Sequence, residues 1–270
     1  MAASDQMSTA ELVALLEWYR EAGVDLAIAE QPIDRLSRRP APVTPVPRPQ
    51  PAILPAPDAA LRMGGDPAEA RALAASANLL EELRTLLEAY DGCQLKFRAT
   101  QLVFSDGNPQ ARIMLIGEAP GAEEDRVGKP FVGRSGQLLD RMLGAIGLDR
   151  SNFYIVNTVP WRPPGNREPT PEEIAQCLPF LVRQVELVAP SVIVTIGGLA
   201  TRQVFDTKQG ILKMRGRVGE VSLGAHSAPA IAMLHPAYLL RNPAAKAHAW
   251  RDMLQLAELM DQRGVTPKKA

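Results

Sequence analysis

The chain has 270 residues, in which 30 Lys and Arg balance 30 Asp and Glu. This length suffices for one sizeable core and an appendage, and the balance excludes a general attraction to nucleic acid but leaves room for a local basic face. No apolar run approaches the roughly 20 residues of a membrane span, and the first residues lack a signal-peptide pattern. The two cysteines, Cys93 and Cys177, are too few for a disulfide framework. We therefore expect a cytoplasmic protein without membrane contact.

The N-terminal part divides by composition. Ser8-Thr-Ala-Glu11 has the pattern of a capping box, and apolar residues follow it at helical spacing, which predicts a helix within residues 1–30. Between Pro40 and Pro57, eight of eighteen residues are proline, which predicts an extended linker over residues 31–66. The main domain is then residues 67–270. The N-terminal helix either docks on this domain or binds a protein partner, and both alternatives stay open.

In the main domain, apolar strand patterns alternate with helical patterns. This alternation predicts an α/β fold with a doubly wound parallel sheet and helices on both faces. The expected strands are residues 102–104, 113–116, 153–156, 192–196 and 231–234, and the expected helices are 67–90, 138–146, 170–188, 198–205 and 244–262, with a basic hairpin over 210–224.

A long glycine-rich loop follows the buried strand 113–116. It lies where the carboxyl end of a parallel strand is expected, which is where open α/β sheets bind ligands. It is not a phosphate-binding P-loop, because Pro130 follows Gly128-Lys129 and Glu123 occupies the position of the first glycine. The dinucleotide fingerprint is absent as well. We interpret residues 117–137 as an active-site loop.

Polar residues follow three of the predicted strands: Glu118, Asn157 and His235. Because parallel strands end at the same sheet edge, these side chains are expected to converge. Asparagine can read the polar edge of a planar base, Phe131 can stack on its face, and histidine can donate to an oxygen that gains charge. A carboxylate can orient water or stabilise an oxocarbenium-like sugar. This set suits hydrolysis of the N-glycosidic bond of a flipped base.

Four joined motifs within about residues 93–256 resemble the fourth, thermophile-type family of uracil-DNA glycosylases. They are Gly117–Asp125, Gly128–Gly136, Asn157 with Arg162–Arg167, and His235-Pro236. The resemblance implies a three-layer α/β/α sandwich with a central four-stranded parallel sheet. It also implies release of uracil from DNA, leaving an abasic site in base excision repair, by a protein that is expected to be a monomer.

Carried over by position, the resemblance assigns roles to individual residues. Glu118, Glu124 and His235 would be catalytic, and Phe131, Asn157, Gly117 and Ala119 would bind uracil. Ala119 stands where other glycosylase families place a catalytic Asp, so the mechanism should rest on stabilisation of the leaving group. Ala237 replaces the serine that usually follows His-Pro, which removes one expected phosphate contact. The expected DNA-binding residues are Arg162, Arg167, Arg215, Tyr238 and Arg241.

The resemblance also implies a 4Fe–4S cluster held by four cysteines. Cys93 and Cys177 occupy two of those positions, but Tyr90 and Trp161 occupy the other two. Since four thiolates are the usual ligand set, we predict that the cluster is lost, that Trp161 packs into its place and that the chemistry requires no cofactor. The remaining cysteines are then small buried hydrophobes.

Two other functions remain alternatives. One is a non-catalytic DNA-binding relative whose N-terminal helix recruits a repair or polymerase partner. The other is a glycosylase that traps the abasic sugar on a loop histidine, which is disfavoured because no His lies between Gly117 and Gly136.

Overall fold

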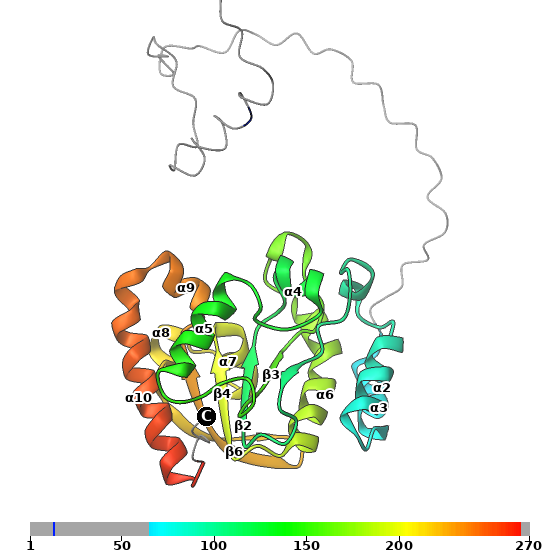
Figure 1. The fold of residues 1–270 in the computed structure, drawn as a ribbon. Helices are drawn as coiled ribbons and strands as arrows, with labels where there is room; N and C mark the ends of the chain where they lie inside the picture. Colours follow the sequence, from blue (N-terminus) through cyan, green and yellow to red (C-terminus); the bar gives the residue numbers. More distant parts are fainter. Residues whose placement is uncertain (1–12, 14–64, 266–270) are drawn as a thin grey trace, which may run out of the picture. The chain divides into compact units, whose positions relative to one another are not determined.

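The structure, a computed structural model, describes residue 13 and residues 65–265 (Figure 1). Apart from residue 13, the predicted N-terminal helix lies outside the described residues, and so does almost all of the predicted linker. The division into residues 1–30, 31–66 and 67–270 therefore stays a prediction.

A single six-stranded sheet runs through the described domain, in the order β1-β3-β2-β4-β6-β5. The four inner strands are parallel to one another, and β1 and β5 add to the two edges in antiparallel orientation. The α/β class is confirmed, and the sheet has two edge strands beyond the four that the resemblance implied. The strands are β1 (Asp106–Gly107), β2 (Ile113–Gly117), β3 (Tyr154–Asn157), β4 (Val192–Ile196), β5 (Val218–Leu223) and β6 (His226–Met233).

The inner strands are apolar throughout because both faces of the sheet are covered. Every residue of β2 and β4 is buried. In β2, Ile113 and Leu115 belong to the core on one face, whereas Met114 and Ile116 belong to the core on the other. The strands read as continuous apolar runs for this reason.

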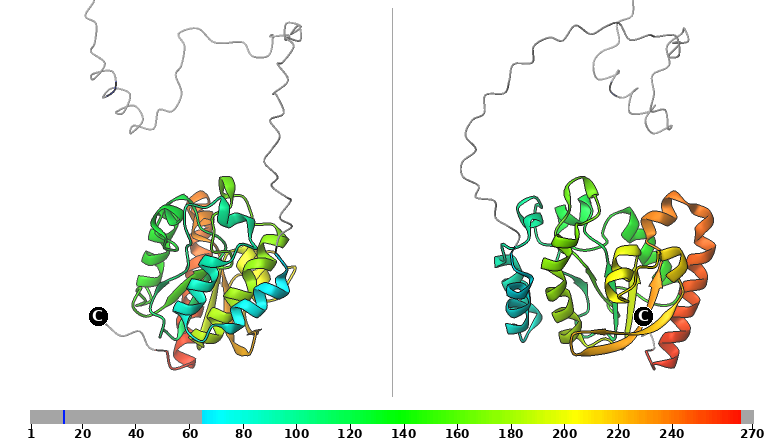
Figure 2. Two further views of the ribbon diagram at one scale, coloured as in Figure 1. Left: turned by 90° about the vertical axis from the view of Figure 1, so that its right-hand side faces the viewer. Right: turned by 180° about the vertical axis from the view of Figure 1, so that it is seen from behind.

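Helices form a layer on each side of the sheet (Figures 1 and 2). Residues of α5 and α10 pack in one core with the sheet, and residues of α6 and α7 pack in the other. Helices α2 and α3 lie against the outer side of α6. The helices are α2 (Pro67–Ser76), α3 (Leu80–Ala89), η1 (Gln94–Phe97), α4 (Ala122–Val127), α5 (Arg134–Gly144), η2 (Pro164–Asn166), α6 (Pro171–Val188), α7 (Gly198–Val204), α8 (Ile211–Met214), α9 (Pro236–Arg241), η3 (Pro243–Ala245) and α10 (Lys246–Gln262).

Three local predictions differ from the structure. The expected helix 67–90 is two helices, because the Glu82 carboxylate accepts the N–H groups of Asn78 and Leu79 and so starts α3 anew. Residues 102–104 form no strand, and the edge strand β1 follows them instead. Residues 211–214 are helical, and the hairpin is made by β5 with β6.

Among the described residues, none of the helices combines the length and apolar character needed to cross a membrane.

Candidate active site

A cavity of about 720 Å³ opens at the carboxyl edge of the parallel strands. Its walls come from the segments that follow β2, β3, β4 and β6, which lie far apart in the chain. The predicted site residues that line it are Glu118, Ala119, Glu124, Phe131, Asn157, Arg167, His235, Tyr238 and Arg241. The structure therefore brings together most of the residues that the sequence analysis selected.

Gly117, at the end of β2, allows two of these side chains to meet. A Cβ atom at Gly117 would lie 2.5 Å from Cε2 of Phe131 and closer still to Oδ1 of Asn157. No real Cβ atom tolerates such distances, so only glycine lets the ring and the amide approach each other here. Gly117 thus permits the corner that Phe131 and Asn157 form, although it does not line the cavity itself.

Asn157 ends β3 and is buried, with 5% of its surface exposed. Its Oδ1 atom has no hydrogen-bond partner within the described part of the chain. A buried acceptor without a partner costs about 1–3 kcal/mol, and this one lies beside the cavity. A ligand N–H group would remove that cost.

His235 follows β6 and caps the start of α9. Its Nδ1 atom accepts the N–H of Ala237 at 3.1 Å, so the neutral ring carries its proton on Nε2. Desolvation lowers the pKa of His235 below its usual 6.5; the carboxylates of Glu118 and Glu124 oppose this shift and Arg241 reinforces it. The ring is therefore a neutral Nε2–H donor at pH 7, and its centroid lies 5.7 Å from that of Phe131.

Glu118 is the first residue after β2, and its carboxylate reaches the start of α7. Its Oε1 atom accepts the N–H of Leu199 at 3.0 Å, and within the described residues its second oxygen has no protein hydrogen bond. Gly197, with φ of +99°, leaves room for this carboxylate, since a Cβ there would overlap Oε1. Gly197 and Gly198 line the cavity and were not predicted, although this glycine pair directly follows a predicted strand.

Glu124 lies in α4, a short helix inside the predicted loop, and holds that loop together. Its Oε1 atom accepts the N–H groups of Val132 at 3.0 Å and Gly133 at 2.9 Å, and Oε2 accepts the N–H of Gly121 at 3.1 Å. Both oxygens are thus engaged with the backbone. This geometry favours a positioning role for Glu124 over placement of water.

Two predicted DNA-binding arginines lie outside the cavity lining. Arg162 donates to Oδ1 of Asn166 at 2.8 Å. Arg215 is held by the fully buried Asp252, with 3.0 Å between Nε and Oδ2. Conversely, Arg134 and Arg202 line the cavity without having been assigned a role. The position of Arg134 within the Gly128–Gly136 motif was the signal that could have identified it.

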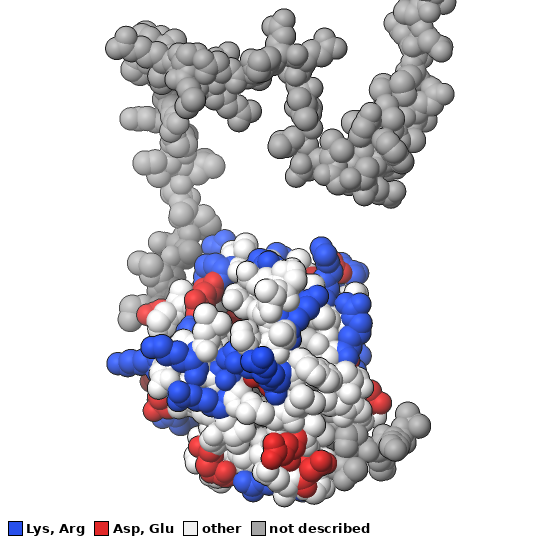
Figure 3. Space-filling model, turned by 90° about the vertical axis from the view of Figure 1, so that its left-hand side faces the viewer, with Lys and Arg blue, Asp and Glu red and all other residues white. Residues whose placement is uncertain are grey.

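The surface beside the cavity is basic despite the neutral total. Figure 3 shows Lys and Arg gathered over the upper half of one face, while Asp and Glu cluster at its lower end. The upper end is the sheet edge that carries α4 and α9 in Figure 1. Arg241, which lines the cavity, is exposed, and so are Lys246 and Arg251 of α10. The placement of charge therefore provides the local basic face that the total charge left open.

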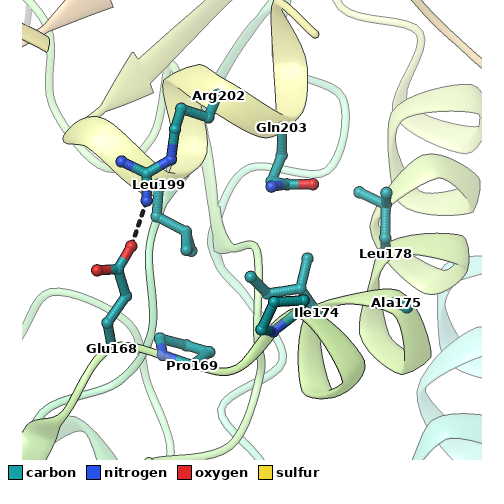
Figure 4. A pocket seen from close by; sticks show the side chains of 9 residues that line it. Glu168, Pro169, Ile174, Ala175, Leu178, Leu199, Arg202 and Gln203 are labelled. Atoms are coloured by element: carbon teal, nitrogen blue, oxygen red, sulfur yellow. Dashed lines mark hydrogen bonds and ion pairs between the residues drawn. The ribbon is translucent and has the colours of Figure 1, made fainter. Parts of the chain in front are cut away.

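A second cavity of about 520 Å³ adjoins the first, between the start of α6 and α7. The two share Glu168, Pro169, Leu199 and Arg202. Figure 4 shows the side chains of Glu168 and Arg202 meeting in an ion pair beside Leu199. This pair lies where the two cavities adjoin.

The positions of the expected cluster ligands lie together in one buried apolar region. Cys93, Cys177, Tyr90 and Trp161 belong to the same core cluster, and the Sγ atoms of the two cysteines lie 3.7 Å apart. Burial raises the pKa of Cys177, whose S–H donates to Cys93, and raises the pKa of Tyr90 to about 12. Tyr90 also donates to Gln176. Two thiols with a phenol and an indole do not fit a 4Fe–4S cluster, and no trio of potential metal ligands occurs elsewhere among the described residues.

Comparison with known proteins identifies the family of the chain. Residues 104–254 match the family described as the uracil DNA glycosylase superfamily. The chain is 40% identical over 178 residues to a type-4 uracil-DNA glycosylase of Archaeoglobus fulgidus, a match that covers 64% of this chain and 89% of the relative. It is 42% identical over 165 residues to a type-4 uracil-DNA glycosylase of Thermotoga maritima, covering 61% and 84%. For that of Sulfurisphaera tokodaii the identity is 37% over 196 residues, covering 70% and 87%.

An α/β fold with this residue set at the carboxyl edge of its sheet, together with the family match, defines a member of the uracil-DNA glycosylase superfamily. The chain belongs to the type-4 uracil-DNA glycosylases.

Proposed function

We propose that this chain hydrolyses the N-glycosidic bond of uracil in DNA, releasing uracil and leaving an abasic site for base excision repair. The observation that carries the proposal is the unpartnered Oδ1 of Asn157, which lies in the wall of the same cavity as the Phe131 ring and a neutral histidine donor. Uracil offers a ring N–H flanked by two carbonyl oxygens, which complements this arrangement.

Base recognition follows from Asn157 and Phe131. In the observed orientation of the amide, Oδ1 accepts the N3–H of uracil and Nδ2 donates to O4. Cytosine lacks the N3 proton and carries an amino donor in place of O4, so both contacts are lost in this orientation. Stacking of the base on Phe131 adds about 1–3 kcal/mol. Extrusion of the base from the duplex precedes these contacts.

Bond cleavage is assisted mainly at the leaving group. As the bond between C1′ and N1 breaks, its electron pair passes into the uracil ring and negative charge develops on O2. The Nε2–H of His235 donates to that oxygen, and a donor fixed before the reaction stabilises the charge without reorganisation. Ala119 supplies no general base, and Glu118 is the carboxylate with an oxygen left to face the cationic sugar or the attacking water.

A cleavage assay tests the function and its site. We expect wild-type protein to release uracil from an oligonucleotide with one uracil, so that alkali then cuts the strand. His235→Ala and Asn157→Ala should each lose about 100-fold or more in rate, as when one transition-state donor is removed. His248→Ala, at an exposed position, is the matched control and should retain activity.

The outcomes separate the remaining alternatives. Intact DNA binding without cleavage would favour the non-catalytic relative, whereas activity that survives both substitutions would place the site elsewhere. Among the described residues no observation favours that relative. The cytoplasmic location, the monomeric state and partner binding through residues 1–30 stay predictions.

A further inference from the structure

The backbone of Phe131 has an unusual conformation. Its φ is +55°, in the left-handed region that bulky residues rarely adopt. Such a conformation persists only where the surroundings hold it, and it tends to occur at functional sites. Because φ sets the direction of the side chain, whatever fixes this backbone also fixes the ring on which the base is proposed to stack.

Arg150 holds this backbone from outside the recognised motifs. It lies in the turn before β3, and its guanidinium donates through Nη2 to the carbonyl of Phe131 at 2.6 Å and through Nη1 to the carbonyl of Pro130 at 3.1 Å. The planar fork of arginine suits two acceptors at once, and a lysine ammonium does not. The carbonyl groups before and after the Cα atom of Phe131 are thereby tied to one rigid group.

The guanidinium is itself fixed on the other side. Asp140 of α5 accepts from Nε at 3.0 Å, and Asp106 of β1 accepts from Nη1 at 3.1 Å. The Phe153 ring lies 5.7 Å below the guanidinium carbon. These contacts leave Arg150 little freedom to follow a moving loop, so the loop must conform to the arginine.

Gly136 leaves the space that the Phe131 carbonyl oxygen occupies. A Cβ on Gly136 would overlap the Phe131 oxygen, whose nearest approach is far inside contact distance. The carbonyl therefore fits between the start of α5 and the Arg150 fork. The start of α5 and the turn before β3 thus meet at one backbone oxygen.

We propose that Arg150 is a positioning residue for base stacking. It holds Phe131 in its left-handed conformation, so that the ring lies where the base is proposed to stack. The expected effect of Arg150 on uracil release rests on the proposed function. Its expected effect on the position of the Phe131 ring does not. Arg150 touches neither substrate nor the reacting atoms, and it acts through Phe131.

The direct test observes the ring. Protein labelled with 4-fluorophenylalanine carries six labels, one at each Phe, and loss of a fluorine resonance in Phe131→Leu assigns the one of interest. In Arg150→Met we expect the Phe131 resonance to shift or broaden. Arg112→Met is the matched control, because Arg112 likewise binds two successive carbonyls, of Arg263 and Gly264, far from the cavity. It should leave the Phe131 resonance in place.

A double-mutant cycle tests the consequence for the reaction. Arg150→Met should slow single-turnover uracil release by about 10- to 100-fold, because small misplacements of binding groups have effects of this size. In the Phe131→Ala background the same change should cost less than about threefold, since residues that act through one another are not additive. Arg112→Met should not change the rate in either background.

Two results would overturn the proposal: an unmoved Phe131 resonance in Arg150→Met, or equal losses of rate in the two backgrounds. Absence of uracil release by wild-type protein would overturn the proposed function instead. The fluorine resonance would still decide the assignment of Arg150 in that case.

Discussion

His235 illustrates how surroundings define a residue's chemistry. A histidine after a strand is expected to titrate near pH 6.5, but desolvation holds the pKa of His235 lower and the Ala237 N–H occupies Nδ1. Protonation would place a second N–H against that donor and break the cap of α9. The neutral form is therefore the one that the structure stabilises.

This geometry predicts the pH dependence of the reaction. Since the folded pKa is depressed, His235 stays neutral as the pH falls through 6.5, and the rate should decline only below that value. The measurement is the single-turnover rate of uracil release against pH, with substrate saturating. A decline centred above pH 6.5 would contradict the assigned protonation state.

Gly117 predicts a loss of activity from one added methyl group. Gly117→Ala should lower the rate of uracil release by about 100-fold, because displacement of the ring and the amide misplaces the bound base. Gly144→Ala is the control, since a Cβ there meets nothing within 4 Å. Equal activity of the two variants would show that the corner formed by Phe131 and Asn157 tolerates the methyl group.

At the scale of elements, the Glu124 carboxylate joins α4 to residues 132–133 of the loop that follows β2. Glu124→Gln replaces an acceptor oxygen by an NH₂ group that faces a backbone N–H, so α4 and residues 132–133 should separate. We expect a fall of about tenfold in uracil release, from misplaced binding groups, together with faster amide exchange at residues 121 and 132–133. Glu82→Gln, which alters a similar carboxylate-to-backbone contact at the start of α3, is the control. Unchanged exchange at those amides would show that Glu124 does not hold the loop.

The contact between Arg215 and Asp252 joins the segment after α8 to α10. The Asp252 side chain is fully buried and that of Arg215 is 20% exposed. Asp252→Ala leaves the arginine without its buried partner, and we expect a loss of about 3–5 kcal/mol in the free energy of unfolding. Urea denaturation would measure it, with the exposed Asp261→Ala as control. A loss below about 1 kcal/mol would mean that the pair is solvated.

At the scale of the whole molecule, the buried region that contains Cys93, Cys177, Tyr90 and Trp161 bears on whether the protein holds a metal cluster. Tyr90 and Trp161 are buried with both cysteines, and Tyr90 packs 5.3 Å from the ring of Phe180. We expect anaerobically purified protein to contain no stoichiometric iron or sulfide and to keep its melting temperature when a chelator is added. A stoichiometric cluster by iron and sulfide analysis would refute the prediction.

Local patterns predicted much of this domain. The strands 113–116 and 192–196 and the helix beginning at Thr170-Pro171 occur close to where periodicity and capping placed them. Glu118, Asn157 and His235 converge because each stands at or just after the carboxyl end of a parallel strand. The sequence shows where each strand ends, and the parallel arrangement of the strands brings these ends to one edge of the sheet.

The break between α2 and α3 is a feature that local sequence patterns did not predict. Leucines recur at helical spacing across it, so periodicity continues, but the Glu82 carboxylate satisfies backbone donors that an unbroken helix would bond internally. The edge strand β1 is likewise decided by its pairing with β3, which is distant in sequence.

The sequence by itself determined the fold class and the family and predicted most of the residues that line the cavity, because these depend on periodicity and on motifs of neighbouring residues. Only the tertiary structure decided that His235 donates through Nε2, that Glu124 is engaged by backbone, that Arg215 pairs with Asp252, and that Arg150 holds Phe131. Each of these depends on which groups meet across the fold, and hydrogen bonding and burial at such meetings set protonation and orientation.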